Sequence, residues 1–219
     1  MKINPSIFKN KQIVIVGLRG TGKTTFCRWL MQYYPRHLAL DFYSERTQTE
    51  KGIMLRGGEY TGYNRYCVSA KEYGEALEKE FNAIATRAIA SKKVDLLIID
   101  EANRIAPNHH PLPNMAMELV DKSRGFNRKG TEATHGMAVV WAARRLAQLN
   151  TDIVELADWV IAFKQTGKND LIRLNELHEG LADIMRKEIT AEAHNFIITD
   201  GNNYAVEKIR QQAEPIKQP

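Results

Sequence analysis

Short, mostly apolar runs alternate along the chain with longer segments in which apolar residues recur every three or four positions. Continuous runs rich in Val and Ile are typical of strands buried on both faces of a parallel sheet. The longer segments have the spacing of helices that bury one face. The expected strands cover residues 13–16, 37–42, 66–70, 94–101, 137–143, 158–163 and 170–177, and the expected helices cover residues 23–34, 71–91, 114–125 and 144–157. Strands and helices in alternation predict an α/β fold with a mainly parallel sheet.

The chain is long enough for a single well-buried domain, which we expect to span residues 1–205. Residues 43–66 are polar and contain three closely spaced glycines, so we expect this stretch to be an insertion or a long loop. Residues 206–219 are expected to form a polar C-terminal tail.

Charge and cysteine content give weak indications of the binding partners and the cellular compartment of the protein. Lys and Arg number 31 against 26 for Asp and Glu, an excess that favours a polyanionic partner such as nucleic acid and equally fits a surplus for solubility. Cys27 and Cys67 form neither a CxxC pair nor a cluster with zinc spacing, which fits a reducing compartment. The N-terminal apolar run is too short for a signal peptide or a membrane span, so we expect a cytoplasmic protein.

Residues 17–24, Gly-Leu-Arg-Gly-Thr-Gly-Lys-Thr, match the pattern GxxxxGK(S/T) between an expected strand and an expected helix. Glycines let the backbone turn tightly enough to aim several N–H groups at one phosphate, and the helix N-terminus adds positive charge. In this pattern Lys23 bridges the outer phosphates of a nucleotide, and the Thr24 hydroxyl ligates the accompanying Mg²⁺. The candidate nucleotide-binding residues are Gly17, Leu18, Arg19, Gly20, Thr21, Gly22, Lys23, Thr24 and Thr25.

A second candidate feature is the acid pair that ends the apolar run of residues 94–101. Open α/β sheets bind their ligands at the carboxyl ends of the strands. There Asp100 suits coordination of the nucleotide's Mg²⁺, through water or Thr24, and Glu101 is the candidate for polarising an attacking water. Because a small-molecule kinase needs no water-activating glutamate, this pair favours hydrolysis over phosphate transfer.

With both features the chain resembles the FtsK/HerA superfamily of P-loop ATPases, and within it the short genome-packaging ATPases of membrane-containing icosahedral viruses. The resemblance rests on residues 17–24, on "IIDEA" at residues 98–102 and on residues 136–163, and it covers most of residues 10–175. It implies a RecA/ASCE-like, three-layer P-loop fold and an ATPase that uses ATP and Mg²⁺ to drive double-stranded DNA into a capsid. It also implies a homo-oligomeric ring, usually a hexamer, with capsid or membrane-vertex proteins as partners, in the host cytoplasm or associated with the virion.

The sequence departs from this superfamily at the sensor position. Members usually have a polar residue, commonly Gln, at the end of the strand that corresponds to residues 137–143, whereas this chain continues with Arg144 and Arg145. Either arginine is a candidate for reading the γ-phosphate. Each equally suits a basic helix start that faces solvent or DNA.

The superfamily also implies an arginine that one subunit supplies to the site of its neighbour, where it stabilises charge on the transferred phosphoryl group. Arg124 and Arg128, within residues 121–136, are the candidates. The same segment equally suits a pore loop that touches the DNA backbone, or a solvated loop.

Two other functions stay open from the sequence. The first is a small-molecule P-loop kinase, against which the lack of an evident Arg-rich lid counts. The second is a nucleotide-controlled module that binds DNA or a capsid protein and turns over slowly.

Overall fold

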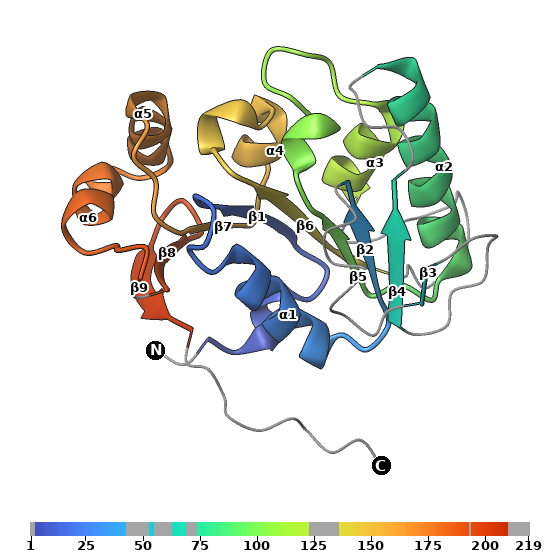
Figure 1. Cartoon of the computed structure of the whole chain (residues 1–219), viewed down its shortest axis with the longest axis horizontal. Helices are drawn as coiled ribbons and strands as arrows, with labels where there is room; N and C mark the ends of the chain where they lie inside the picture. Colours follow the sequence, from blue (N-terminus) through green and yellow to red (C-terminus); the bar gives the residue numbers. More distant parts are fainter. Residues whose placement is uncertain are drawn as a thin grey trace.

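The computed structural model describes residues 3–42, 53–54, 63–68, 74–122, 136–192 and 194–209, which form one central sheet with helices on both faces (Figure 1). Its strands are β1 (Gln12–Val16), β2 (His37–Asp41), β3 (Ile53–Met54), β4 (Tyr63–Cys67), β5 (Leu96–Ile99), β6 (Ala138–Ala143), β7 (Trp159–Ala162), β8 (Asn195–Thr199) and β9 (Tyr204–Lys208). The order of these strands is β3-β4-β2-β5-β6-β1-β7-β8-β9. Strands β1 to β7 pair in parallel, and β8 and β9 add an antiparallel edge. The mainly parallel sheet predicted from the alternating pattern is confirmed.

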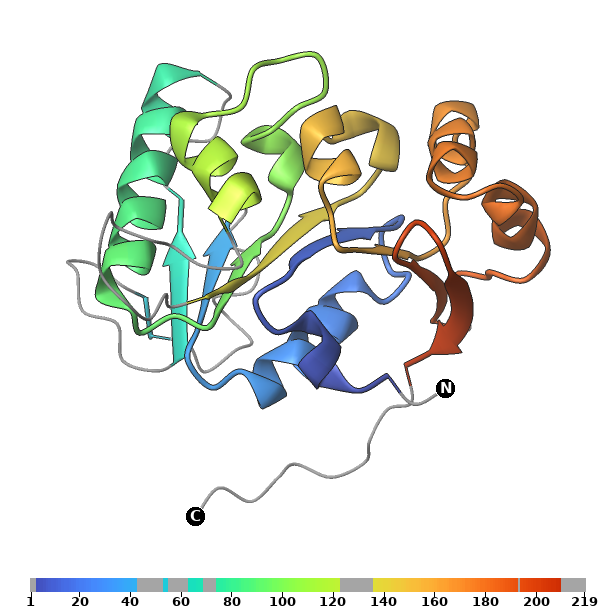
Figure 2. The ribbon, with the colours of Figure 1, turned by 180° about the vertical axis from the view of Figure 1, so that it is seen from behind.

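The helices form two layers, which the opposite views show on either side of the sheet (Figure 1, Figure 2). One layer contains α1 (Lys23–Tyr33) and the 3-10 helix η1 (Pro5–Phe8). The other contains α2 (Glu75–Ser91), α3 (Asn114–Lys122), α4 (Thr151–Glu155), α5 (Lys168–Leu177), α6 (Leu181–Lys187) and the 3-10 helices η2 (Ala102–Arg104) and η3 (Leu146–Gln148). The three-layer sandwich implied by the resemblance is therefore confirmed.

Both faces of the central strands are covered, which explains why these strands are apolar throughout. Ile13 and Ile15 of β1 pack in the core with α1, whereas Val14 and Val16 pack in the core with α2 and α3. All four side chains are fully buried, and each such burial contributes about 1.5–3 kcal/mol to stability. Strand β1 is thus held between two layers, and the loop that follows it starts from a fixed point.

One predicted strand is wrong. Residues 170–177 belong to helix α5, in which Leu171 and Leu174 lie three residues apart and both turn toward the core. Ile172 lies between buried positions in the sequence and so favours the prediction of a strand, but its side chain is exposed.

The single helix predicted for residues 144–157 is also wrong, because the chain forms two short pieces, η3 and α4, in its place. The break lies at Asn150, whose side-chain oxygen accepts a hydrogen bond from the N–H of Asp152 at 2.9 Å. Asn150 therefore caps the start of α4 rather than continuing a helix.

Two domain boundaries also differ from the prediction. The expected insertion, residues 43–66, contributes β3 and most of β4 to the sheet, and the rest of this stretch lies outside the described residues. At the C-terminus, β9 continues to Lys208, past the predicted boundary at residue 205. This edge strand alternates exposed and half-buried residues, so its sequence contains no apolar run and is typical of a polar tail. No helix in the described ranges has the length and apolar character needed to span a membrane.

Candidate nucleotide-binding site

The glycine-rich loop joins the carboxyl end of β1 to the start of α1, and its glycines are required by the geometry. Gly20 and Gly22 have left-handed backbones, with φ of 78° and 118°. A Cβ atom on Gly22 would lie 2.9 Å from the ring of Phe163, and one on Gly17 would lie 2.6 Å from the Cβ of Phe163. Side chains at either position would therefore displace the loop from the segment that follows β7.

Hydrogen bonds fix this loop to its surroundings. The N–H of Leu18 donates to the carbonyl of Lys164 at 3.1 Å, and the buried hydroxyl of Thr21 donates to the carbonyl of Leu18 at 2.8 Å. Lys164 in turn donates from its ammonium group to the carbonyl of Met185 in α6 at 3.0 Å. Phe163 and Lys164 thus support the loop from the segment after β7, a role that no local sequence pattern indicates.

Lys23 is the cation at the centre of the site. Its ammonium group donates to the backbone carbonyls of Gly17 at 2.5 Å and Leu18 at 3.1 Å. Burial lowers the pKa of Lys23 from its ordinary value, and the carboxylates of Asp100 and Glu101 partly offset this by raising it. A half-buried cation held by neutral carbonyls beside a glycine-rich loop fits an anionic ligand such as a nucleotide phosphate.

Asp100 and Glu101 follow β5, which is separated from β1 by β6 alone, so both carboxylates act electrostatically on Lys23. Asp100 accepts a hydrogen bond from the N–H of Glu101 at 3.2 Å. The backbone of Glu101 is left-handed, with φ of 52°, an uncommon conformation for a residue other than glycine. This turn starts η2 and bends the chain sharply at the acid pair.

Arg144 completes the cluster of charges from the carboxyl end of β6. Its Nε donates to Oε1 of Glu101 at 2.8 Å, in an ion pair whose Arg144 side chain is 49% exposed and whose Glu101 side chain is 14% exposed. The amide of the buried Gln165 donates to the backbone carbonyl of Arg144 at 3.0 Å and so fixes the end of the strand. The structure thus brings Lys23, Asp100, Glu101 and Arg144 together in one site.

Arg145, the alternative sensor, is directed elsewhere. Its Nε donates to Oδ2 of Asp170 at 3.0 Å, and the other oxygen of this buried carboxylate accepts from the N–H of Ala147 at 2.9 Å. A Cβ on Gly167 would lie 2.3 Å from Asp170, so the chain closes tightly around the carboxylate. Arg145 and Asp170 therefore join η3 to α5, and of the two arginines Arg144 is the one at the acid pair.

Replacing Asp170 with alanine is expected to lower the free energy of unfolding by about 1–3 kcal/mol, because the N–H of Ala147 loses its buried acceptor and Arg145 its partner. Urea unfolding followed by circular dichroism measures this loss. Asp183→Ala is the matched control, since Asp183 forms an exposed ion pair with Arg186 within α6 and its loss should change stability by less than about 0.5 kcal/mol. Equal losses of unfolding free energy in the two variants would contradict the role of Asp170 in joining η3 to α5.

The other predicted residues lie as follows. Thr24 and Thr25 are in the first turn of α1, beside Lys23, and Arg19 is exposed at the tip of the loop. Arg124 and Arg128, proposed to act on a neighbouring subunit, lie outside the described residues.

A glycine-rich loop between β1 and α1, with a lysine at the helix start and an acid pair after β5, defines a P-loop nucleotide-binding domain. A family model described as an AAA domain matches residues 8–144, which is more than half of the chain. The chain therefore belongs to this AAA domain family. The matched region extends from η1 through Arg144 and contains both the loop and the acid pair. A sequence search of curated proteins gave no match.

Solved structures of viral packaging enzymes have the same fold. The genome packaging NTPase B204 from Sulfolobus turreted icosahedral virus 2, in complex with AMPPCP, aligns with a TM-score of 0.69 and 18% identity, over 94% of this chain and 100% of that chain. B204, the DNA-packaging ATPase from Sulfolobus turreted icosahedral virus, aligns with a TM-score of 0.68 and 18% identity, over 92% of this chain and 99% of that chain. At these identities the likeness shows the fold, which is the one that the resemblance implies.

A more distant match is EssC (ATPases 2 and 3) from Geobacillus thermodenitrificans. It aligns with a TM-score of 0.57 and 14% identity, over 96% of this chain and 41% of that chain. The same P-loop fold therefore occurs within a much longer chain.

Proposed function

We propose that this protein is a Mg²⁺-dependent ATPase that couples ATP hydrolysis to the movement of double-stranded DNA, and that it packages a viral genome into a capsid. The observation that carries the hydrolytic part is the cluster of Lys23, Asp100, Glu101 and Arg144 at the carboxyl edge of the sheet. It combines a cation on the phosphate loop with a carboxylate suited to activating water.

The roles follow from the chemistry of each group. Lys23 and the N–H groups of the loop bind the outer phosphates and neutralise their charge. The hydroxyl of Thr24 and the carboxylate of Asp100 are the oxygen ligands that Mg²⁺ prefers, and these two residues would hold it. When bound, Mg²⁺ stabilises the charge that develops on the phosphate oxygens.

Glu101 is the proposed general base. Its carboxylate accepts the proton of the attacking water, while the bond from Arg144 to Oε1 holds it in one orientation. The guanidinium of Arg144 is a planar group with five N–H donors, a geometry that suits phosphate oxygens, and we assign it a contact with the γ-phosphate beside its ion pair with Glu101. Arg144 is thus proposed to take the place of the polar sensor of the superfamily.

DNA movement is supported by the fold and by the resemblance. The two B204 proteins are described as genome-packaging and DNA-packaging enzymes, and they align over nearly the whole of this chain. On this proposal the protein assembles as a homo-oligomeric ring, a hexamer, in which Arg124 or Arg128 reaches the nucleotide site of the neighbouring subunit. Capsid or membrane-vertex proteins are the further partners.

The proposed function is tested by the rate of ATP hydrolysis with and without duplex DNA. A translocase is expected to be stimulated several-fold by DNA. Tight DNA binding with no stimulation indicates the binding module, and phosphate transfer to a nucleoside acceptor indicates the kinase.

Native mass measurement with nucleotide and DNA tests the ring. A protein that stays monomeric under those conditions contradicts the proposal that a neighbouring subunit supplies an arginine.

A further inference from the structure

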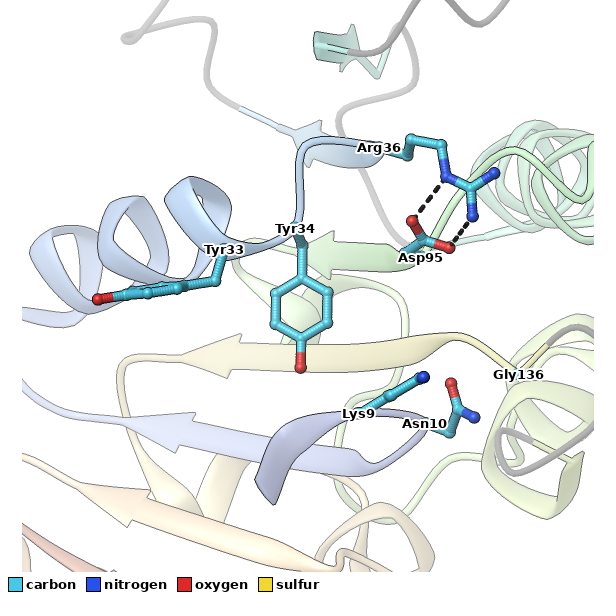
Figure 3. Close-up of a pocket in the computed structure, with 7 residues that line it drawn as sticks. All are labelled: Lys9, Asn10, Tyr33, Tyr34, Arg36, Asp95 and Gly136. Carbon is cyan, nitrogen blue, oxygen red and sulfur yellow. Dashed lines mark hydrogen bonds and ion pairs between the residues drawn. The ribbon is translucent and has the colours of Figure 1, made fainter. Parts of the chain in front are cut away.

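A cavity of about 500 Å³ lies at the edge of the sheet opposite to the phosphate loop. Figure 3 shows the residues that line it. Five of its seven lining residues shortly precede parallel strands: Lys9 and Asn10 before β1, Arg36 before β2, Asp95 before β5 and Gly136 before β6. The other two, Tyr33 and Tyr34, lie at the end of α1. The cavity therefore opens at the amino ends of the strands. It is separated from the nucleotide site by the length of β1, five residues or about 16 Å.

Hydrogen-bond donors exceed free acceptors in this cavity. Asp95 is the acid of its lining, and both oxygens of its carboxylate accept from Arg36, at 2.7 Å from Nε and 2.5 Å from Nη2. Figure 3 shows this pair on one side of the cavity and Lys9 and Asn10 on the other. The ammonium group of Lys9, the amide of Asn10 and the hydroxyl of Tyr33 have no hydrogen-bond or ion-pair partner among the described residues.

Positive charge continues beyond the cavity along the same edge. Lys92 and Lys93 are exposed and stand just before Asp95 in the chain, and neither has an acidic partner in the described part of the protein. Lys11 is already paired with Asp158 at 2.8 Å. We name this surface the basic edge, and it comprises Lys9, Asn10, Tyr33, Arg36, Lys92 and Lys93.

We propose that the basic edge binds the phosphate backbone of DNA. Ammonium, guanidinium, amide and phenol groups are donors that proteins use to hold phosphate and sugar without reading sequence. The proposal rests on the proposed function, because an enzyme that moves along a genome needs contacts that do not depend on sequence. Because the basic edge and the nucleotide site lie at opposite edges of the sheet, DNA and a nucleotide can bind at the same time.

The extent of the charge favours a polymer over a small anion. The cavity has the size of a small-molecule site, which leaves room for a sugar with its phosphate, and the lysines outside it supply charges for adjacent phosphates. Exposed lysines act as hydrated point charges on flexible stems, which suits a backbone that slides past. An acidic protein surface, such as that of a second copy, is the alternative occupant that the experiment separates.

The test is the affinity of the whole protein for a short fluorescein-labelled DNA duplex, measured by fluorescence anisotropy at several salt concentrations. Lys9→Gln is expected to weaken binding by about 3–10-fold at low salt and to lower the slope of log Kd against log salt by about one. The double variant Lys92→Gln/Lys93→Gln is expected to lower this slope by about two. The rate of ATP hydrolysis without DNA stays at the wild-type value in both variants.

Lys79→Gln is the matched control, because Lys79 is exposed near the start of α2 and the substitution changes the net charge equally. Equal affinity and slope for Lys9→Gln and Lys79→Gln overturn the proposal, as does a wild-type protein that binds no DNA. Unchanged DNA affinity with an altered oligomer size in sedimentation also overturns it and assigns the basic edge to a subunit contact. If DNA binds through Lys9 but leaves the hydrolysis rate unchanged, the basic edge stands and the proposed function fails.

Discussion

Replacing Glu101 with glutamine is expected to lower the rate of ATP turnover by about 10²–10⁴-fold and to leave ATP affinity close to that of the wild type. Glutamine has nearly the same size and can still accept the hydrogen bond from Arg144 through its carbonyl oxygen. It cannot take a proton from the attacking water. Steady-state phosphate release measures turnover, and titration with a fluorescent ATP analogue measures binding.

Glu176→Gln is the control for this experiment, since Glu176 is exposed on α5 and the substitution removes the same charge. Its turnover should match that of the wild type. Wild-type turnover in Glu101→Gln would remove Glu101 from the chemistry. A loss of ATP affinity equal to the loss of turnover would instead give Glu101 a role in shaping the loop through Lys23.

Replacing Lys23 with methionine is expected to weaken ATP binding by about 10²-fold or more, because charge-assisted hydrogen bonds to two phosphates are lost. The fold should survive. Burial lowers the pKa of Lys23, which means that its charge is costly in the nucleotide-free protein, and methionine removes that charge while keeping most of the volume. Isothermal titration measures ATP affinity, and urea unfolding should give a free energy within about 1 kcal/mol of the wild type.

The shift in Tm that ATP produces gives an independent measurement, since a ligand that binds only the folded state stabilises it by an amount that grows with the logarithm of the ratio of ligand concentration to Kd. ATP should raise the Tm of the wild type and of Lys79→Met, and should leave that of Lys23→Met unchanged. A normal ATP-induced shift in Lys23→Met would show that the nucleotide does not depend on this lysine.

The parts of the site that follow from sequence are those encoded by neighbouring residues. The strand β1, the glycine-rich loop and α1 are contiguous, so spacing alone places Lys23 at a helix start. Asp100 and Glu101 follow a short, fully buried strand, whose carboxyl end in a parallel sheet falls on the same edge as the loop. Local pattern and general topology are sufficient for these assignments.

Other parts depend on contacts between distant residues and could not be predicted. Arg144 and Arg145 are adjacent and alike in sequence, yet one pairs with Glu101 and the other with Asp170. Asp170 lies in the segment predicted as a strand, where the exposed Ile172 hides the helical spacing. The difference between the two arginines therefore arises from the packing of α5, which no local rule supplies.

Lys164 connects two regions that the chain keeps far apart. Its carbonyl accepts the N–H of Leu18 in the phosphate loop, and its ammonium group donates to the carbonyl of Met185 in α6. The adjacent N–H of Gln165 also contacts the sulfur of Met185 at 3.2 Å. Lys164 and Gln165 thus join the phosphate loop to α6, so the position of the loop depends on the packing of a helix that begins more than 160 residues after Leu18 as well as on the loop's own sequence.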